Sequence, residues 1–268
     1  MGKHRWMALF MVAVFIAAVS FLPRAAYAVN VDLELVLLVD VSGSVDATDF
    51  ALQQTGYVQA FQSASIQNAI MSGGTYHSIA ATLVYWSDSA VQSVGWSLIN
   101  DAASANTFAA AISAAVRPYS GGTGMTNAVN FGAGLFNNNF TGTRNVIDLS
   151  GDGSESNVCN EQVMNCLPLQ NARDAALAGG VTTINALFIE NHPWFGIAAT
   201  DYVNAIDYAN TNLIGGANAF VSIASGYPDF GAAIASKLAK EITVPEPSIL
   251  LLFGAGLLGL GAAKRKLS

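Results

Sequence analysis

Residues 33–44 read Leu-Glu-Leu-Val-Leu-Leu-Val-Asp-Val-Ser-Gly-Ser, and both the expected architecture and the candidate site start from this stretch. The nearly continuous apolar run Leu33–Val39 is typical of a strand buried on both faces of a parallel sheet. A tight polar turn follows, in which the alternate residues Asp40, Ser42 and Ser44 can direct a carboxylate and two hydroxyls to one point. Hard divalent cations such as Mg²⁺ prefer oxygen ligands, so the turn indicates a cation site.

Two later segments can supply the ligands that this turn lacks. Residues 121–126 read Gly-Gly-Thr-Gly-Met-Thr, and residues 146–153 read Val-Ile-Asp-Leu-Ser-Gly-Asp-Gly. Thr123 and Asp152 each stand where a loop meets a regular element. Alone, an Asp-x-Ser-x-Ser string is a weak signal, because Asp and Ser are ordinary turn formers. The three segments together are a stronger one.

Strand-like and helix-like segments alternate along the chain. Apolar, β-rich runs predict strands at 33–39, 79–86, 91–99, 145–150, 181–189 and 219–223, and helical spacing predicts helices at 46–71, 102–116, 127–136, 168–178, 200–210 and 227–242. The short polar link between the second and third strands predicts a hairpin, and hence an antiparallel edge strand. We therefore expect one α/β domain with a doubly wound, mostly parallel six-stranded sheet flanked by helices.

This topology makes its own prediction about the site. Doubly wound sheets bind ligands beyond the carboxyl ends of their strands, at the point where the winding reverses, usually between strands one and four. Asp40 ends the first predicted strand and Asp152 follows the fourth. The expected fold and the motif therefore indicate the same place.

The three segments together resemble the metal-ion-dependent adhesion site of von Willebrand factor A domains, and the likeness covers about residues 31–242. It implies that a divalent cation, Mg²⁺ first and Mn²⁺ or Ca²⁺ next, is the cofactor. The ligands that the resemblance implies are Ser42 and Ser44 directly, Thr123 directly or through water, and Asp40 and Asp152 largely through water, with Thr126 instead of Thr123 if the loop is shifted. Mostly neutral ligands leave the ion much of its charge and an open position, which attracts a carboxylate from a partner.

Several further segments resemble a bacterial family of secreted A-domain proteins to which no activity is assigned. They are residues 146–153, 172–175, 183–187 and 214–221. Where such relatives continue Gly-Asp-Gly with Pro-Asn-Asn, this chain has Ser-Glu-Ser-Asn at residues 154–157, followed by a loop between two cysteines. The resemblance therefore does not define the rim that faces a partner.

Asp148 is a polar residue within a strand that should be buried, so its carboxylate needs a partner. It either supports the metal ligands or is paired within the core. The second interpretation is favoured, because buried polar groups are usually paired.

The two ends of the chain read as targeting segments. Residues 1–28 combine a basic start, an apolar stretch and an Ala-Tyr-Ala cleavage site, which is typical of a secretory signal peptide. Residues 244–268 combine Pro-Glu-Pro, an apolar stretch at 248–263 that predicts a short membrane helix, and a basic cluster. This order resembles the PEP-CTERM sorting signal, which implies processing by an exosortase and transport to the cell surface or matrix; a plain C-terminal anchor is the alternative.

Composition narrows the partners further. Residues 29–245 contain five basic and seventeen acidic side chains, a formal net charge of −12, which argues against nucleic acid as a partner. The only two cysteines, Cys159 and Cys166, are expected to form one disulfide in an oxidising compartment. Two free thiols remain the alternative, and a two-cysteine metal site is disfavoured because no histidine is near.

The sequence favours a binding module over an enzyme. It has neither a Gly-x-Ser-x-Gly nor a His-Glu-x-x-His motif, and only His77 and His192 lie outside the signal peptide. We therefore expect an exported, metal-dependent adhesion or binding module that takes a carboxylate from a protein or an acidic polysaccharide. A passive structural matrix protein is the alternative, and a metal-assisted hydrolase is a weaker one, since no phosphate-binding loop accompanies the site.

Overall fold

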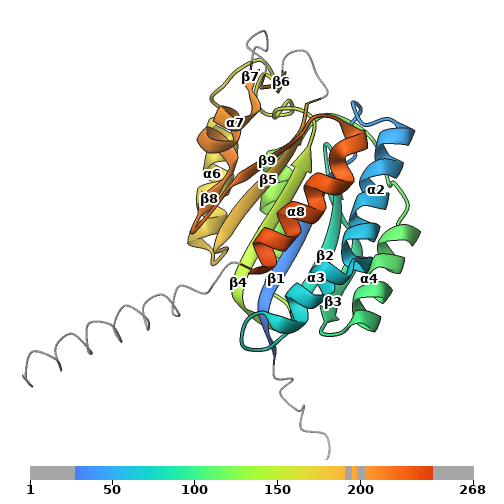
Figure 1. Cartoon of the computed structure of the whole chain (residues 1–268). Coiled ribbons are helices and arrows are strands. Elements are labelled where there is room, and N and C mark those ends of the chain that lie inside the picture. The colour runs from blue at the N-terminus through green and yellow to red at the C-terminus, as the bar shows by residue number, and fades with distance from the viewer. Residues whose placement is uncertain (1–27, 191–194, 198–202, 244–268) are drawn as a thin grey trace, which may run out of the picture.

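The computed structural model describes residues 28–190, 195–197 and 203–243, and within these ranges the chain forms one three-layer α/β domain (Figure 1). The predicted signal peptide, apart from Ala28, and the predicted sorting segment with its membrane helix lie outside the described residues. Among the helices of the described ranges, none has the length and apolarity needed to cross a membrane.

The central sheet has seven strands. They are β1 (Val29–Asp40), β2 (Ile79–Trp86), β3 (Ala90–Ile99), β4 (Phe140–Gly151), β5 (Thr183–Ile189), β8 (Gly215–Gly216) and β9 (Val221–Ala224). The order is β3-β2-β1-β4-β5-β8, and β9 pairs with the other half of β5. β1 is parallel to both β2 and β4, while β3 is antiparallel to β2. The winding therefore reverses between β1 and β4, as predicted.

Helices cover both faces of this sheet. They are α2 (Ala47–Gln62), α3 (Ala64–Ser72), α4 (Ala102–Ala114), α5 (Met125–Gly134), α6 (Leu167–Ala178), α7 (Ala205–Tyr208) and α8 (Phe230–Thr243). In Figure 1, α2, α3, α4 and α8 lie in front of the sheet. Odd-numbered residues of β1, such as Leu35, belong to the core under these helices, while Val36 and Leu38 belong to the second core, which includes residues of α5 and α6. Period-two alternation between two buried faces thus explains why the run 33–39 is apolar apart from Glu34.

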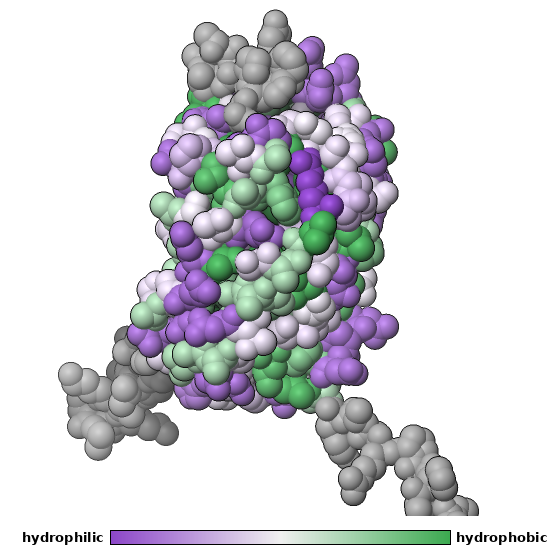
Figure 2. Space-filling view, turned by 90° about the vertical axis from the view of Figure 1, so that its right-hand side faces the viewer, coloured by the Kyte–Doolittle hydropathy of each residue, from purple (hydrophilic) through white to green (hydrophobic). Residues whose placement is uncertain are grey.

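The surface on the α2 and α4 side is mixed. Figure 2 shows hydrophilic and hydrophobic residues interspersed over that face. Such scattering is ordinary for a folded domain and by itself indicates no interface.

The structure corrects the prediction in three places. The helix predicted at 46–71 is two helices. Ser63 has an extended backbone that ends the first helix, and its hydroxyl accepts a hydrogen bond from Ile66 N and caps the second. The sheet has seven strands rather than six, because the two-residue β8 adds a second antiparallel pair. The helix predicted at 200–210 is not a single helix in its described part. The two-residue strand β7 (Val203–Asn204) pairs with β6 (Phe195–Gly196) and is followed by α7 and then by a π-helical turn, Ala209–Leu213.

Candidate metal site

The turn after β1 brings three of the expected ligands together. Asp40 and Ser42 are buried, with exposed fractions of 0% and 1%. Ser42 N donates to Asp40 Oδ1 at 2.7 Å, which fixes the turn, and the hydroxyls of Ser42 and Ser44 are 3.1 Å apart. The alternate spacing read from the sequence therefore gives converging oxygens.

Asp152 joins this group from the end of β4. The Ser44 hydroxyl donates to Asp152 Oδ1 at 2.6 Å, across 108 residues of sequence. The other carboxylate oxygen accepts a hydrogen bond from the Tyr227 hydroxyl at 2.8 Å. Burial and the nearby negative charge of Asp152 raise the pKa of Tyr227, so the phenol keeps its proton and stays a donor.

The loop that carries Thr123 is attached to the same turn. Gly43 N donates to Gly121 O at 2.7 Å. A side-chain Cβ built at Gly153 would lie 3.7 Å from Thr123 Oγ1, so the threonine hydroxyl faces the segment after Asp152. Arg117 holds the turn from the other side, donating to the carbonyl oxygens of residues 41 and 42 at 2.8 Å each.

A cavity of about 200 Å³ opens between these segments. Its lining includes Ser44, Thr123 and Asp152, together with Ser154, Ser156 and Glu161 from the segment that follows β4. The cavity is therefore walled by oxygen-bearing side chains and lies at the carboxyl ends of β1 and β4, where the topology predicted a site.

The electrostatics of Asp40 fit a cation. Its Oδ2 is buried and has no hydrogen-bond partner, and a Cβ at Gly151 would lie 3.0 Å from it, so a larger residue at position 151 would crowd this oxygen. Burial, and then the negative charge of Asp152, raise the pKa of Asp40 to about 8. A divalent cation next to two carboxylates removes this repulsion, and its bound water can serve an unpartnered oxygen.

The donor set suits a hard cation. Among the residues that the structure describes, His, Cys, Asp and Glu side chains form no group of three or more that could hold a metal. A metal at this cavity would therefore rely on hydroxyls beside two carboxylates, which is oxygen-only chemistry suited to Mg²⁺, Mn²⁺ or Ca²⁺. The residues present fit such an ion.

Thr126, the second choice for the threonine ligand, lies at the start of α5. Its backbone N donates to Glu155 Oε2 at 2.7 Å, and its buried hydroxyl has no partner. The described lining of the cavity includes Thr123 but not Thr126.

Asp148 is engaged elsewhere. Its carboxylate forms an ion pair with Lys237 of α8, and both side chains are fully buried. Lys237 also contacts Glu241 Oε1 at 2.7 Å. Burial lowers the pKa of Lys237, but the charges of Asp148 and Glu241 outweigh this and raise it, so the ammonium stays charged. This is the core pairing that the sequence interpretation favoured for Asp148.

Three residues at the site were not predicted: Tyr227, Arg117 and Glu155. Each acts on a segment distant in sequence, for example Tyr227 on Asp152 across 75 residues. The one available signal was Glu155 within Ser-Glu-Ser-Asn, a charged residue two positions after the Asp-Gly ligand segment.

Comparisons with known proteins agree with this fold. A family model described as "Protein of unknown function (DUF1194)" matches residues 30–246, and the PEP-CTERM protein-sorting motif matches residues 243–266, which confirms the predicted sorting signal. No curated protein matches the sequence.

Solved structures of von Willebrand factor A type share the fold. A von Willebrand factor type A protein from Catenulispora acidiphila is 15% identical, with a TM-score of 0.54, and the match covers 79% of this chain and 43% of that one. Proximal thread matrix protein 1 from the mussel byssus, with a zinc-occupied MIDAS motif, is 15% identical, with a TM-score of 0.51, covering 82% and 48%. The pilus adhesin SpaC from Lactobacillus rhamnosus GG is 16% identical, with a TM-score of 0.55, covering 80% and 30%. The chain thus spans half or less of these structures, and the likeness shows the fold alone.

Proposed function

Because this chain belongs to the DUF1194 family, whose description assigns no function, we propose a function from the site itself: an exported module that binds a partner through a divalent cation. The ion is held by Ser42, Ser44 and Thr123, with Asp40 and Asp152 contributing largely through water. A carboxylate of the partner completes the coordination.

One observation carries this proposal. Ser44, Thr123 and Asp152, from three separate segments, line a single cavity at the switch point of the sheet. Asp40 and Ser42 lie in the same turn as Ser44 but outside the cavity lining, and the buried Asp40 Oδ2 has no hydrogen-bond partner. Buried polar groups in folded proteins are usually paired. An unpaired carboxylate beside a second one is stable only with a counter-ion or a proton.

The structural neighbours support the proposal without establishing it. One of them is described with a zinc-occupied MIDAS motif, one is a pilus adhesin and one is a thread matrix protein. Their names indicate metal binding, adhesion and matrix roles for those proteins, and Zn²⁺ therefore joins Mg²⁺, Mn²⁺ and Ca²⁺ among the ions to be tested.

We place the module outside the inner membrane. The PEP-CTERM match supports sorting by an exosortase-type enzyme to the cell surface or extracellular matrix, with the C-terminal segment as a transient membrane anchor. We propose binding rather than catalysis, since the sequence contains neither a Gly-x-Ser-x-Gly nor a His-Glu-x-x-His motif.

The test is calorimetric titration of the four metals into chelator-treated full-length protein. We expect Ser42→Ala with Ser44→Ala, and separately Asp40→Ala, to abolish metal binding while far-ultraviolet circular dichroism stays native. A matched control is Ser93→Ala with Ser97→Ala, two serines of the edge strand β3 that bond only to local carbonyls.

Two results would count against the proposal. Retained binding in the Asp40 variant would place the ion elsewhere. Absence of binding of all four ions at millimolar concentration would leave the structural alternative, a passive matrix module, which the mussel thread matrix neighbour favours. In that case Asp40→Ala would change neither folding nor surface association.

A further inference from the structure

The segment after Asp152 forms one wall of the cavity. We call residues 154–166 the disulfide loop, because Cys159 and Cys166 are joined with a Cα–Cα distance of 5.7 Å. Ser154, Ser156 and Glu161 of this loop line the cavity. Any partner that reaches a metal ion there must therefore also touch the disulfide loop.

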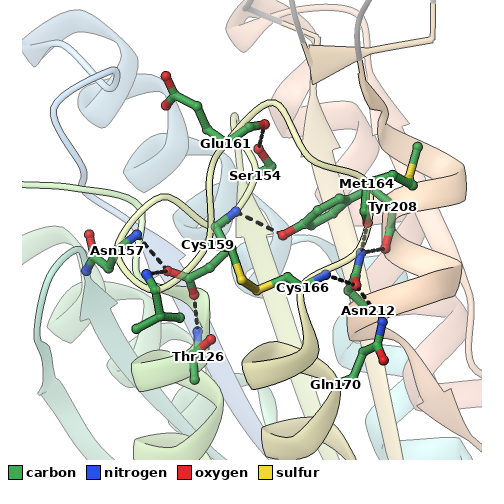
Figure 3. The surroundings of a disulfide bond; sticks show 12 residues. Thr126, Ser154, Asn157, Cys159, Glu161, Met164, Cys166, Gln170, Tyr208 and Asn212 are labelled. Carbon is green, nitrogen blue, oxygen red and sulfur yellow. Dashed lines mark hydrogen bonds between the residues drawn. A yellow bond between two sulfur atoms is a disulfide. The ribbon is translucent and has the colours of Figure 1, made fainter.

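The disulfide loop is held firmly on the domain. Its end is fixed by Asn212, which accepts a hydrogen bond from Cys166 N at 2.8 Å and donates one to Met164 O at 2.7 Å. Its start is fixed by Glu155 N, which donates to the Tyr208 hydroxyl at 3.0 Å (Figure 3). A surface that is already ordered loses little conformational entropy when a partner binds.

The same loop is also joined to the metal-binding loop. Ser156 N donates to Thr123 O at 2.8 Å, and the Ser156 hydroxyl accepts from Thr123 N at 2.9 Å. The buried Glu155 carboxylate accepts hydrogen bonds from the backbone N of Thr126, Asn157 and Val158. The disulfide loop and the threonine ligand therefore behave as one unit.

Apolar side chains are exposed on this ordered loop and just after it. Val158 is 50% exposed, Val163 is 45% exposed, and Leu167, at the first turn of α6, is 64% exposed. Val158 lies two residues after Ser156 and Val163 two residues after Glu161, both of which line the cavity. Exposed apolar side chains thus lie, along the chain, within two residues of the cavity lining.

Acidic side chains also lie beside the cavity. Glu161 lines the cavity with an exposed side chain, and Asp88, also exposed, accepts a hydrogen bond from Gly122 N at 2.8 Å. Burial, and then the negative charges of Asp46 and of Asp152, raise the pKa of Asp49, so this carboxylate also lies near Asp152. None of the described residues that line the cavity is basic. At physiological ionic strength such charges interact over about 8 Å, so a polymer with many carboxylates is repelled.

From this arrangement we propose that the partner is a protein that offers one carboxylate flanked by apolar and basic side chains, and that it is not an acidic polysaccharide. The carboxylate completes the metal coordination, the apolar side chains pack on Val158 and Val163, and the basic ones face Asp88 and Glu161. This inference rests on the proposed function and assigns the partner class that the sequence left open.

The experiment uses full-length protein with saturating Mn²⁺ and three probes. The first is a heptapeptide with blocked ends, of sequence lysine-leucine-valine-glutamate-valine-leucine-lysine. The second replaces its leucines and valines by serine and glycine at equal charge, and the third is polygalacturonate. We expect the first peptide to bind at least about tenfold more tightly than the second, as burial of several methyl groups predicts, and polygalacturonate to bind weakest.

Variants connect this preference to the loop. Val158→Ser with Val163→Ser is expected to lower affinity for the first peptide about tenfold and to leave metal affinity unchanged. The matched control is Val29→Ser, at the opposite end of β1, where the side chain is 44% exposed. Unchanged metal affinity in the double variant shows that the fold and the ion site are intact.

The outcomes separate the two proposals. Equal binding of both peptides, stronger binding of polygalacturonate, no loss in the valine variant, or no probe binding to metal-loaded protein would each overturn the partner assignment and leave the metal site standing. Failure of the protein to bind metal at all would instead refute the proposed function.

Discussion

Replacing Asp40 by Asn should stabilise the protein in the absence of metal and destabilise it, relative to the wild type, in the presence of metal. Asp40 is fully buried, its Oδ2 has no hydrogen-bond partner, and the charge of Asp152 is close. Leaving a buried polar group unsatisfied costs about 1–3 kcal/mol, and more when the group is charged. Asparagine keeps an oxygen that can accept from Ser42 N, and it removes the charge.

In chelator, we therefore expect Asp40→Asn to raise the free energy of unfolding by about 1–2 kcal/mol. The gain is not larger, because the new side-chain NH₂ group is itself a buried donor without a partner. For a domain of this size, 1 kcal/mol corresponds to a shift in Tm of about 2–4 °C. Metal at a hundred times its Kd adds about 2.7 kcal/mol to the wild type and nothing to a variant that cannot bind it. The order of the two melting temperatures should thus reverse when metal is added.

The measurement is thermal unfolding at pH 8, followed by circular dichroism, with EDTA and then with Mg²⁺ or Mn²⁺. Asp88→Asn, which alters an exposed carboxylate on the same rim, is the control and should change Tm little in either condition. A variant that is less stable than the wild type in EDTA, or that keeps its full metal-induced shift, would refute the reasoning, because Asp40 would then be a structural residue.

Three further predictions concern the buried carboxylates. Lys237→Met leaves Asp148 and Glu241 without their cation, and it should lower the free energy of unfolding, measured in urea at pH 8.5, by about 3–5 kcal/mol. The control is Lys240→Met, which removes only an exposed ammonium 3.6 Å from the centre of the Phe220 ring and should cost about 1 kcal/mol or less. Burial, and then the charge of Asp148, raise the pKa of Glu241 from 4.5 to about 8, so the contribution of Glu241 to stability falls as the pH rises through that window. Between pH 5 and 8.5, the Glu241→Gln variant should therefore lose less stability than the wild type. An equal loss in both proteins would contradict this. Glu155→Gln should lower the free energy of unfolding by about 1.5–3 kcal/mol and weaken metal binding measured by calorimetry, because the neutral amide is a poorer acceptor for three backbone N–H groups. Unchanged metal affinity would show that the disulfide loop and the loop that carries Thr123 are not coupled.

The local part of the site was predictable because its geometry follows from short-range rules. Asp40, Ser42 and Ser44 alternate along one turn, and the strand before them is apolar on both faces, so strand, turn and converging oxygens follow from spacing. Asp152 could be added because doubly wound sheets place the ends of strands one and four together. The parallel pairing of Val39 with Ser150 gives that placement in the structure.

The contacts that complete the site could not be predicted, because they depend on packing between distant segments. Nothing in the Gly-Tyr-Pro sequence around Tyr227 indicates a donor to Asp152, and Arg117 meets the first turn across about 75 residues. The break at Ser63 was missed for a different reason, since a serine can either sit within a helix or cap the next one. Here its hydroxyl bonds both Ala60 O and Ile66 N, which selects the cap.

The comparison of two buried aspartates gives the clearest argument for a functional site. Asp148 and Asp40 are both fully buried, one within β4 and one at the end of β1. A buried carboxylate in a finished core needs a cation, and Asp148 has Lys237. Asp40 has instead an unpartnered oxygen and a second carboxylate nearby. Since α8 supplies a permanent cation to Asp148 and no described ion pair does the same for Asp40, we propose that Asp40 takes its cation from solution.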